Sequence, residues 1–563
     1  MGVIADKIRR AIFGGEVRDS IADGIEVVEQ LREDYDRQVI NAGNSNAEIV
    51  DARGGQAKLK NRLDNFDSHL EQINTEIGVL PETYIAKSGI WGEINLRGIN
   101  IEWFGAVGDG NTDCTIAIRN AMDFAGNIPV IIPEGNFISK YIYLNSNQKV
   151  ILIGNLICEQ NELGNLFYLD NKENVTILGI GGKAKGSTKD TNNFIKAINS
   201  NNICIEGVKL EGFKNKGIDI GDNCFDVIVR KNIVSGSTSV SGAGISALGI
   251  NCKNVIISDN IVSNCRIGIA VNGGSNHIVS NNVCKDNILM GIGIDGIVAE
   301  SGDGVKDSII KGNIITGTIG DSYGGLYIGN GASRNLISNN VITNNGRAGI
   351  RISGGEGFKN IRNIIQNNNI YNNTNGIEAS YSEESLFLSN IISNNGKGII
   401  LFNSDENNIS NNEILGNLDD GIKLQSGNNK INNNKIKLNN VGIRIAYGGS
   451  NPSYNVIENN DITKNTTSSI INADINTFNH NKGYITENQG IATKLVSGGK
   501  IPHGLSGNPS VSPYGSVLVQ AKGGSAIGPQ NIMVTSDETN ITIYFSGNES
   551  YDFYWRASVG SIN

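Results

Sequence analysis

The chain has 563 residues, a net charge of −9 and a pI of about 5.2. No run of Lys or Arg interrupts this acidity, so the composition argues against a nucleic-acid-binding surface. No stretch reaches the ~18 apolar residues of a membrane-spanning helix, so no membrane partner is expected either.

Residues 1–80 have the apolar spacing of helices. In the second half of this segment, apolar residues recur at alternating intervals of four and three, which is the a/d seam of a short coiled coil. The seam consists of Leu59, Leu63, Phe66, Leu70, Ile73, Ile77 and Leu80. We predict that this segment joins several copies of the chain in parallel; a monomeric helical hairpin is the alternative. Residues 81–98 are expected to be a linker.

The segment 101–113, with the sequence IEWFGAVGDGNTD, precedes a helical pattern that runs to Ala125. Its glycines permit a tight turn, and Thr112 or Asp113 is placed to cap the first turn of the helix. We therefore expect Asp109 and Asp113 to act in the fold rather than in catalysis.

Between about Gly217 and Ile462, one short pattern recurs: G-I-x-I, a few loop residues, and N-x-I-x-x-N-x-I. Later copies begin about every 21 to 27 residues, a period typical of a solenoid and too short for a βαβ unit. Alternating Ile and polar residues predict strands of three or four residues, with Asn and Gly at bends that need left-handed backbone. We predict an all-β fold with a right-handed parallel β-helix at residues 99–490.

Seven cysteines occur, an odd number without a C-x-x-C pair. This pattern argues against structural zinc, and we expect reduced, mostly buried thiols. No metal and no cofactor are expected. Residues 491–563 alternate apolar and polar positions between glycine-containing turns, which predicts a small C-terminal β-domain.

Several segments resemble one protein family. The segment 101–113, with Ile132-Pro133-Glu134-Gly135-Asn136-Phe137 after the helix, closely resembles the entry motif of the pectate-lyase-like superfamily, as found in bacteriophage tailspikes and pre-neck appendage proteins. Residues 13–54 resemble the start of tail fibres and baseplate proteins from phages of Gram-positive hosts, and residues 501–557 resemble the β-domain that closes such fibres. The resemblance implies a homotrimeric virion spike whose N-terminus attaches to a phage tail or baseplate protein.

The middle residue of each G-I-x-I copy should point outward, and adjacent rungs of a β-helix lie ~4.8 Å apart. These residues therefore predict one surface column, formed in chain order by Asp219, Ser246, Ala270, Gly293, Tyr327, Arg351, Glu378, Ile400, Lys423 and Arg444.

Tyr327, Arg351 and Glu378 would occupy three successive rungs of this column, where an exposed ring stacks on a sugar and charged groups bind its polar substituents. We assign Tyr327, Arg351, Lys423 and Arg444 as candidate substrate-binding residues. The alternative is a solvated ladder with an Arg351–Glu378 salt bridge.

The longest excursion from the repeat, residues 295–304, brings Asp295, Glu300 and Asp303 to the edge of the column. Glycoside hydrolysis uses a protonated carboxyl group and an ionised one, ~5 Å apart for retention and ~6.5–9.5 Å for inversion. We assign Asp295, Glu300, Asp303 and Glu378 as candidate catalytic residues, with Asp295 as the preferred acid/base. The alternative is that Asp303 only forms a turn and that Glu300 is solvated.

Together these observations predict a phage tailspike or appendage that binds a host surface polymer, either capsular polysaccharide or wall teichoic acid, and cleaves it by glycoside hydrolysis. Lyase or phosphodiesterase chemistry and a non-catalytic adhesin of the same fold remain alternatives; a bacterial surface β-helix is a weaker one. The first residues lack a signal peptide's apolar core, so we expect assembly in the host cytoplasm and a final location in the virion.

Overall fold

The computed structural model describes most of the chain after residue 97. The described ranges are 98–158, 165–186, 193–236, 242–296, 303–471, 476–484, 487–506, 516–521, 530–537, 539–546 and 550–558. The predicted coiled coil of residues 1–80 and nearly all of the expected linker lie outside these ranges. Among the described residues, no helix combines the length and apolarity that crossing a bilayer requires.

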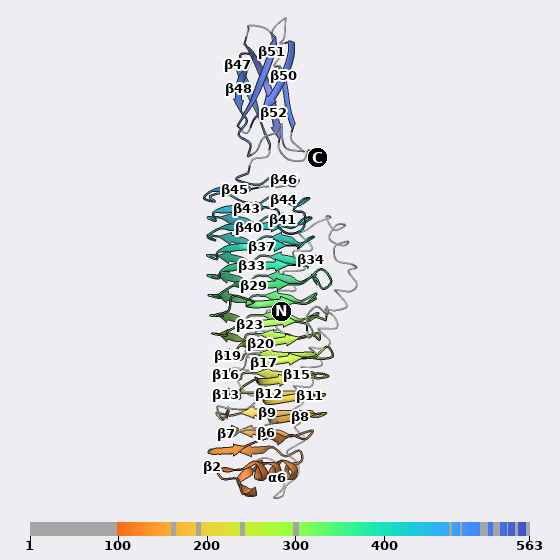
Figure 1. Ribbon diagram of the computed structural model, residues 1–563, viewed down its shortest axis with the longest axis vertical. Helices are drawn as coiled ribbons and strands as arrows, with labels where there is room; N and C mark the ends of the chain where they lie inside the picture. The colour runs from red at the N-terminus through yellow and green to blue at the C-terminus, as the bar shows by residue number, and fades with distance from the viewer. Residues whose placement is uncertain are drawn as a thin grey trace, which may run out of the picture. The chain divides into compact units, whose positions relative to one another are not determined.

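Three parallel sheets of short strands wind into a solenoid (Figure 1). Sheet A has 16 strands, sheet B has 14 and sheet C has 14. The first and last strands of each are, for sheet A, β1 (Ile99–Asn100) and β46 (Thr477–Asn479); for sheet B, β2 (Asp109–Asp113) and β42 (Lys435–Lys437); and for sheet C, β5 (Ile142–Tyr143) and β45 (Ser468–Ile471).

One coil contributes one strand to each sheet in turn, as β27 (Leu336–Ser338), β28 (Val341–Thr343) and β29 (Ala348–Ser353) illustrate. Short bends join A to B and B to C, whereas the longer connections, such as the one from β29 to the next strand of sheet A, run from C to A. The predicted parallel β-helix is therefore confirmed.

The first coils are covered by η2 (Ile101–Phe104) and α6 (Thr115–Ala125), and α6 is the helix predicted to end at Ala125 (Figure 1). The N-cap of α6 is Cys114 rather than the predicted Thr112 or Asp113; Asp113, one residue earlier, accepts the backbone N–H of Thr115 at 3.0 Å. Hydrogen bonds from backbone N–H groups of its own turn, the largest from Thr112, lower the pKa of Asp109. Both carboxylates thus act in the fold.

The interior is a continuous stack of Ile, Val, Leu and Phe side chains contributed by all three sheets. The seven cysteines are unpaired thiols, and all except Cys204 are fully buried, which confirms the expectation from sequence. Burial raises the pKa of Cys224 to about 11 and that of Cys252 to about 12, so these thiols stay protonated and unreactive at neutral pH.

Buried asparagines stack from coil to coil at the three corners of the solenoid. In the A-to-B corner, the Asn340 side chain donates to the Ile310 carbonyl at 3.0 Å and to Asn368 Oδ1 at 2.9 Å. The same Asn368 oxygen accepts the backbone N–H of Asn340 at 3.0 Å. Because an amide both donates and accepts, each asparagine satisfies the bend below it and the bend above it.

The spacing of these ladders explains the asparagine repeat in the sequence. One coil places Asn335, Asn340 and Asn345 at its three corners, five residues apart, and the corresponding residues of the next coil pair with them. Left-handed backbone is adopted by the preceding residue instead, such as Asn339 and Asn344, each with φ 56°. The sequence interpretation treated these asparagines as one group, but their roles differ.

The C-terminal β-domain predicted from the sequence consists of two three-stranded antiparallel sheets. One contains β47 (Glu487–Leu495), β52 (Tyr551–Ser558) and β49 (Ser516–Ala521); the other contains β48 (Gly499–Pro502), β51 (Asn540–Ser546) and β50 (Gln530–Ser536). Ile541, Ile543, Phe553 and Trp555 belong to their shared core. Pairing of β47 with β52 begins at Glu487, slightly before the expected boundary at residue 491.

The ladders predict that Asn390→Leu will destabilise the β-helix. Asn390 donates to the Ile365 carbonyl at 2.8 Å and accepts the backbone N–H of Asn368 at 3.0 Å, and leucine leaves both groups buried without a partner. We expect a loss of at least ~2 kcal/mol in urea unfolding. Asn411→Gly is the control, since Asn411 is exposed with φ 57°, a conformation that glycine adopts freely. Equal unfolding midpoints for the two variants would contradict the role assigned to the ladders.

Candidate functional site

The outward face of sheet C carries the predicted column. Its central strands are β20 (Ile267–Asn272), β23 (Met290–Asp295), β26 (Gly324–Gly329), β29, β33 (Asn375–Ser380), β37 (Lys397–Phe402), β40 (Asp420–Gln425) and β43 (Val441–Ile445). Strand register pairs Gly293 with Tyr327, Tyr327 with Arg351, and Arg351 with Glu378. It continues through Ile400 and Lys423 to Arg444, so the order predicted from the repeat is confirmed.

Asp295 ends β23 at the edge of this face. Its Oδ1 accepts the Asn330 side-chain amide at 2.7 Å and the Gly296 backbone N–H at 2.9 Å. Burial raises the pKa of Asp295, and the nearby charge of Asp303 acts in the same direction, while the two hydrogen bonds oppose the rise. A carboxyl group with a raised pKa on an outward face is suited to general acid chemistry.

Two glycines leave the space in which these groups meet. A Cβ atom at Gly329 would lie 2.5 Å from Asp295 Oδ1 and 2.7 Å from the Tyr327 hydroxyl oxygen. A Cβ atom at Gly296 would lie 2.6 Å from Asp303 Oδ1. Asp295, Asp303 and Tyr327 therefore lie close together, as the sequence predicted. The sequence did not identify the two glycines or Asn330 as parts of this site.

Tyr327 differs from the expectation that its ring is exposed for stacking on a sugar. Its side chain is only 6% exposed, and its ring packs edge-on against Tyr323, with 4.9 Å between the centroids. Burial, and then the charge of Asp295, raise the pKa of Tyr327 to about 12, so its hydroxyl stays protonated. Tyr323 is the more exposed ring. In the sequence, the only indication that Tyr323 contributes to the site was its position in the loop before β26.

The Arg351–Glu378 salt bridge of the alternative interpretation is replaced in the structure by a pair between Glu378 and Arg347. Glu378 Oε2 accepts from Arg347 Nε at 2.9 Å, and Oε1 accepts from the Asn375 amide at 2.5 Å. Arg347 begins the approach to β29 from the B-to-C corner, a position outside the G-I-x-I pattern, so the repeat did not reveal it. With both oxygens engaged, Glu378 is suited to positioning rather than to proton transfer.

At the C-terminal end of the column, Arg444 is also engaged in ion pairs. Arg444 Nε donates to Asp420 Oδ1 at 2.7 Å, and its guanidinium lies 3.9 Å from Asp419. Lys423 is beside it in register, two rungs beyond Glu378. Asp295, Asp303, Tyr327, Arg351 and Glu378 thus form one neighbourhood, Lys423 and Arg444 lie apart from it, and Glu300 falls outside the described residues.

Within the described ranges, no three His, Cys, Asp or Glu side chains lie close enough together to hold a metal ion. His277 is buried at a corner of the solenoid, and burial lowers its pKa to about 4. Its Nδ1 accepts the Val255 backbone N–H at 3.3 Å, so this residue serves the fold.

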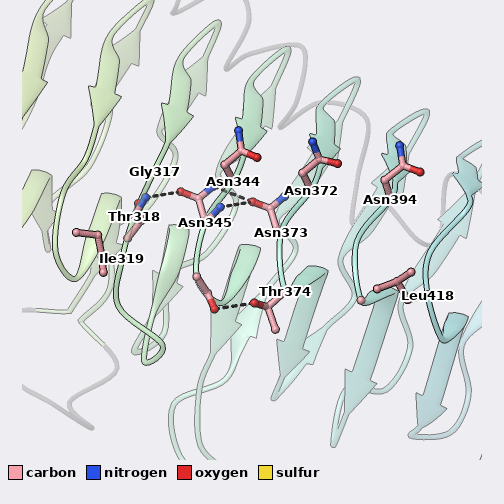
Figure 2. A pocket seen from close by; sticks show the side chains of 12 residues that line it. Gly317, Thr318, Ile319, Asn344, Asn345, Asn372, Asn373, Thr374, Asn394 and Leu418 are labelled. Carbon is pink, nitrogen blue, oxygen red and sulfur yellow. Dashed lines mark hydrogen bonds between the residues drawn. The ribbon is translucent and has the colours of Figure 1, made fainter.

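A shallow and largely open groove of about 660 Å³ lies beside this face, at the corner between sheets B and C (Figure 2). Ile319 and Leu418, 72% and 82% exposed, stand at its two ends. Between them the chain carries small residues, Gly346, Thr374 and Gly396. The amides of Asn344, Asn372 and Asn394 follow one another along its side (Figure 2).

The groove adjoins the Glu378 end of this neighbourhood, because residues that line the groove are followed directly in the chain by residues that bind Glu378. Arg347 follows Gly346, and Asn375 follows Thr374, so the residues that hold Glu378 begin where the groove floor ends. None of the residues predicted as site residues lines the groove. Sequence reasoning missed it because glycine and threonine at a bend look like ordinary turn residues.

Two family models match the chain. Residues 98–298 match the model described as rhamnogalacturonase A/epimerase, pectate lyase-like, and residues 324–489 match the right handed beta helix region. The predicted resemblance to pectate-lyase-like right-handed β-helices is thereby confirmed; a Gram-positive host stays a prediction. No curated protein sequence matches the chain.

Solved structures with this fold include a tailspike mutant of E. coli bacteriophage HK620 in complex with a pentasaccharide, at 13% identity and a TM-score of 0.56, covering 85% of this chain and 97% of that one. The A-module of the Azotobacter vinelandii mannuronan C-5 epimerase AlgE4 matches at 15% identity, 64% and 99% coverage and a TM-score of 0.47. The Streptococcus pneumoniae surface adhesin PfbA matches at 16% identity, 63% and 93% coverage and a TM-score of 0.47. At 13% identity the likeness to the tailspike concerns the fold alone, and function must come from the site.

The pKa of Asp295 predicts how the pH dependence of stability changes in Asp295→Asn. Because the folded-state pKa is raised above 3.8, ionising Asp295 as the pH rises through that pKa costs stability. Asparagine has no proton to lose, so the melting temperature of Asp295→Asn relative to wild type should increase from pH 4 to pH 7. Asp109→Asn should change in the opposite direction and at lower pH: because the pKa of Asp109 is lowered, the melting temperature of this variant relative to wild type should fall as the pH rises toward about 4 and stay nearly constant from pH 4 to pH 7. Parallel pH profiles for the wild type and Asp295→Asn would contradict the raised pKa.

Proposed function

We propose that this chain is a tailspike-like phage protein that binds a host surface polymer and cleaves it by glycoside hydrolysis on the face of sheet C. The observation that carries the proposal is Asp295, a carboxyl group with a raised pKa, held beside Asp303 on an outward face. The similar fold of a phage tailspike in complex with a pentasaccharide supports this choice of substrate class.

In this mechanism Asp295 is the general acid. Its Oδ1 accepts two hydrogen bonds, so its proton resides on Oδ2, from which it is donated to the oxygen of the leaving sugar. Asp303 is the ionised partner that activates water or attacks the sugar directly, and Glu300 is the second candidate for that role. The distance between the two carboxyl groups in the substrate complex decides whether the configuration is inverted or retained.

Other residues of the neighbourhood orient the sugar. The Tyr327 hydroxyl stays protonated and can donate beside Asp295, and Arg351 presents N–H donors one rung further along. Glu378, fixed by Arg347 and Asn375, holds that end of the site in place.

The groove is the track along which the rest of the polymer lies. It follows the stacking direction of the coils, so an extended chain meets a new rung every ~4.8 Å. Amide groups along its side suit hydroxyl groups, while Ile319 and Leu418 suit the apolar faces of sugar rings. The polymer we propose is capsular polysaccharide or wall teichoic acid, and assembly as a trimer docked to a phage tail by residues 1–80 belongs to the same proposal.

Purified protein incubated with capsular polysaccharide or wall teichoic acid should shorten the chains, seen as smaller products and new reducing ends. Asp295→Asn should lower the rate by at least ~100-fold, since general acid catalysis contributes about that much, with binding retained. Activity should also fall as the pH rises through the pKa of Asp295. Glu413→Gln, an exposed carboxylate on sheet B paired with Lys435 at 3.1 Å, is the control. Saturable binding with no shortening would favour the adhesin instead.

Filling the groove should weaken binding of long chains. Thr374 is exposed on the groove floor, so Thr374→Phe places a ring between Ile319 and Leu418. We expect roughly tenfold weaker binding of the polymer, about 1.4 kcal/mol, with only a small fall in melting temperature from loss of the exposed hydrogen bond that the Thr374 hydroxyl donates to the Gly346 carbonyl at 2.7 Å. Ile391→Phe adds similar bulk at a 45% exposed position of sheet B and should bind like wild type. Unchanged binding by Thr374→Phe would remove the groove from the polymer's path.

A further inference from the structure

Arg351 differs from the other arginines of the sheet C face, since Arg347 is paired with Glu378 and Arg444 with Asp420, whereas no ion pair satisfies Arg351 in the described part of the chain. It is partly buried on β29, between the rungs of Tyr327 and Glu378. In the described part of the chain, no carboxylate oxygen lies within 4.0 Å of its guanidinium, whereas Arg444 of the same column is paired with Asp420. A partly buried guanidinium without a carboxylate partner has binding capacity that a ligand can use.

The surroundings of Arg351 leave its charge unbalanced. Glu378, its neighbour in register, is bound by Arg347 at 2.9 Å, so the charges of these two residues oppose each other at Arg351 and the Arg351 charge remains without a partner. Arg347 is in turn anchored by the Asp321 carbonyl at 2.9 Å. Asp295, whose charge faces Tyr327 on the next rung, has a raised pKa and loses its negative charge on acidification.

We infer that Arg351 forms an anion-binding subsite, so that the polymer cleaved at Asp295 carries a negatively charged repeating group. The group is a carboxylate or a phosphodiester, both of which present the paired oxygens that a guanidinium binds in bidentate fashion. The inference rests on the proposed function and adds the substrate's charge to it. An acidic chain with a net charge of −9 repels such polymers elsewhere on its surface, so binding concentrates at this position.

The test uses the full chain with Asp295→Asn added to prevent cleavage, and measures binding to polygalacturonate, poly(glycerol phosphate) and neutral dextran. Arg351→Gln removes the charge, Arg351→Lys keeps the charge without the planar fork, and Arg334→Gln is the matched control. Arg334 is paired with Asp307 at 2.7 Å at another corner of the solenoid. Melting temperatures verify that each variant is folded.

The parent should bind one of the two anionic polymers at least tenfold more tightly than dextran, and more weakly as salt rises. Arg351→Gln should lose roughly tenfold to a hundredfold in affinity and most of the salt dependence, Arg351→Lys should lose less, and Arg334→Gln should match the parent. The anionic polymer that binds identifies the group as carboxylate or phosphodiester.

Failure of the subsite and failure of the proposed function give different results. Binding that ignores Arg351, a preference for dextran, or no salt-dependent binding to either anionic polymer would overturn the subsite, even if a neutral polymer is cleaved when Asp295 is intact. Arg351-dependent binding of an anionic polymer that the wild-type chain never shortens would leave the subsite standing and refute hydrolysis.

Discussion

Stacking of one coil on the next through asparagine ladders is the constraint on which the rest of the structure depends. A solenoid has few contacts between distant segments, so its geometry is maintained only if each coil meets its neighbour in one register. Apolar side chains alone tolerate slippage between coils, because one isoleucine packs much like another. Asn340 does not tolerate such slippage, because its side chain must bind the Ile310 carbonyl below and Asn368 above.

That fixed register turns a sequence repeat into a surface. Side chains at equivalent positions of successive coils become neighbours in a column, as Tyr327, Arg351 and Glu378 do. The repeat is broken beside Asp295. The insertion after β23 brings Asp303 back to Asp295, and Gly329 leaves the space into which the carboxyl and phenol groups extend. The regular part of the fold supplies rigidity, and the irregular part surrounds the carboxyl group whose pKa is raised.

Charge on the sheet C face is distributed unevenly. At the upper end, Asp420 and Arg444 neutralise each other, and burial raises the pKa of Asp420. Around Arg351, the carboxylate of Glu378 on the neighbouring strand β33 is already bound by Arg347, so within the described residues no ion pair balances the Arg351 charge. The charge of the sheet C face therefore varies along the axis of the coils, and the adjoining groove runs in the same direction.

The amino-acid sequence by itself determined the solenoid, the order of the surface column, the capping helix, the structural roles of Asp109 and Asp113 and the C-terminal β-domain, because each follows from local periodicity or a contiguous motif. The pairing of charges was decided only by tertiary structure. Arg347 reaches Glu378 from a corner outside the repeat, Tyr323 buries the Tyr327 ring from a loop, and Asn330 fixes Asp295 from the next coil. Such contacts depend on how far a side chain reaches between coils, which spacing along the chain does not encode.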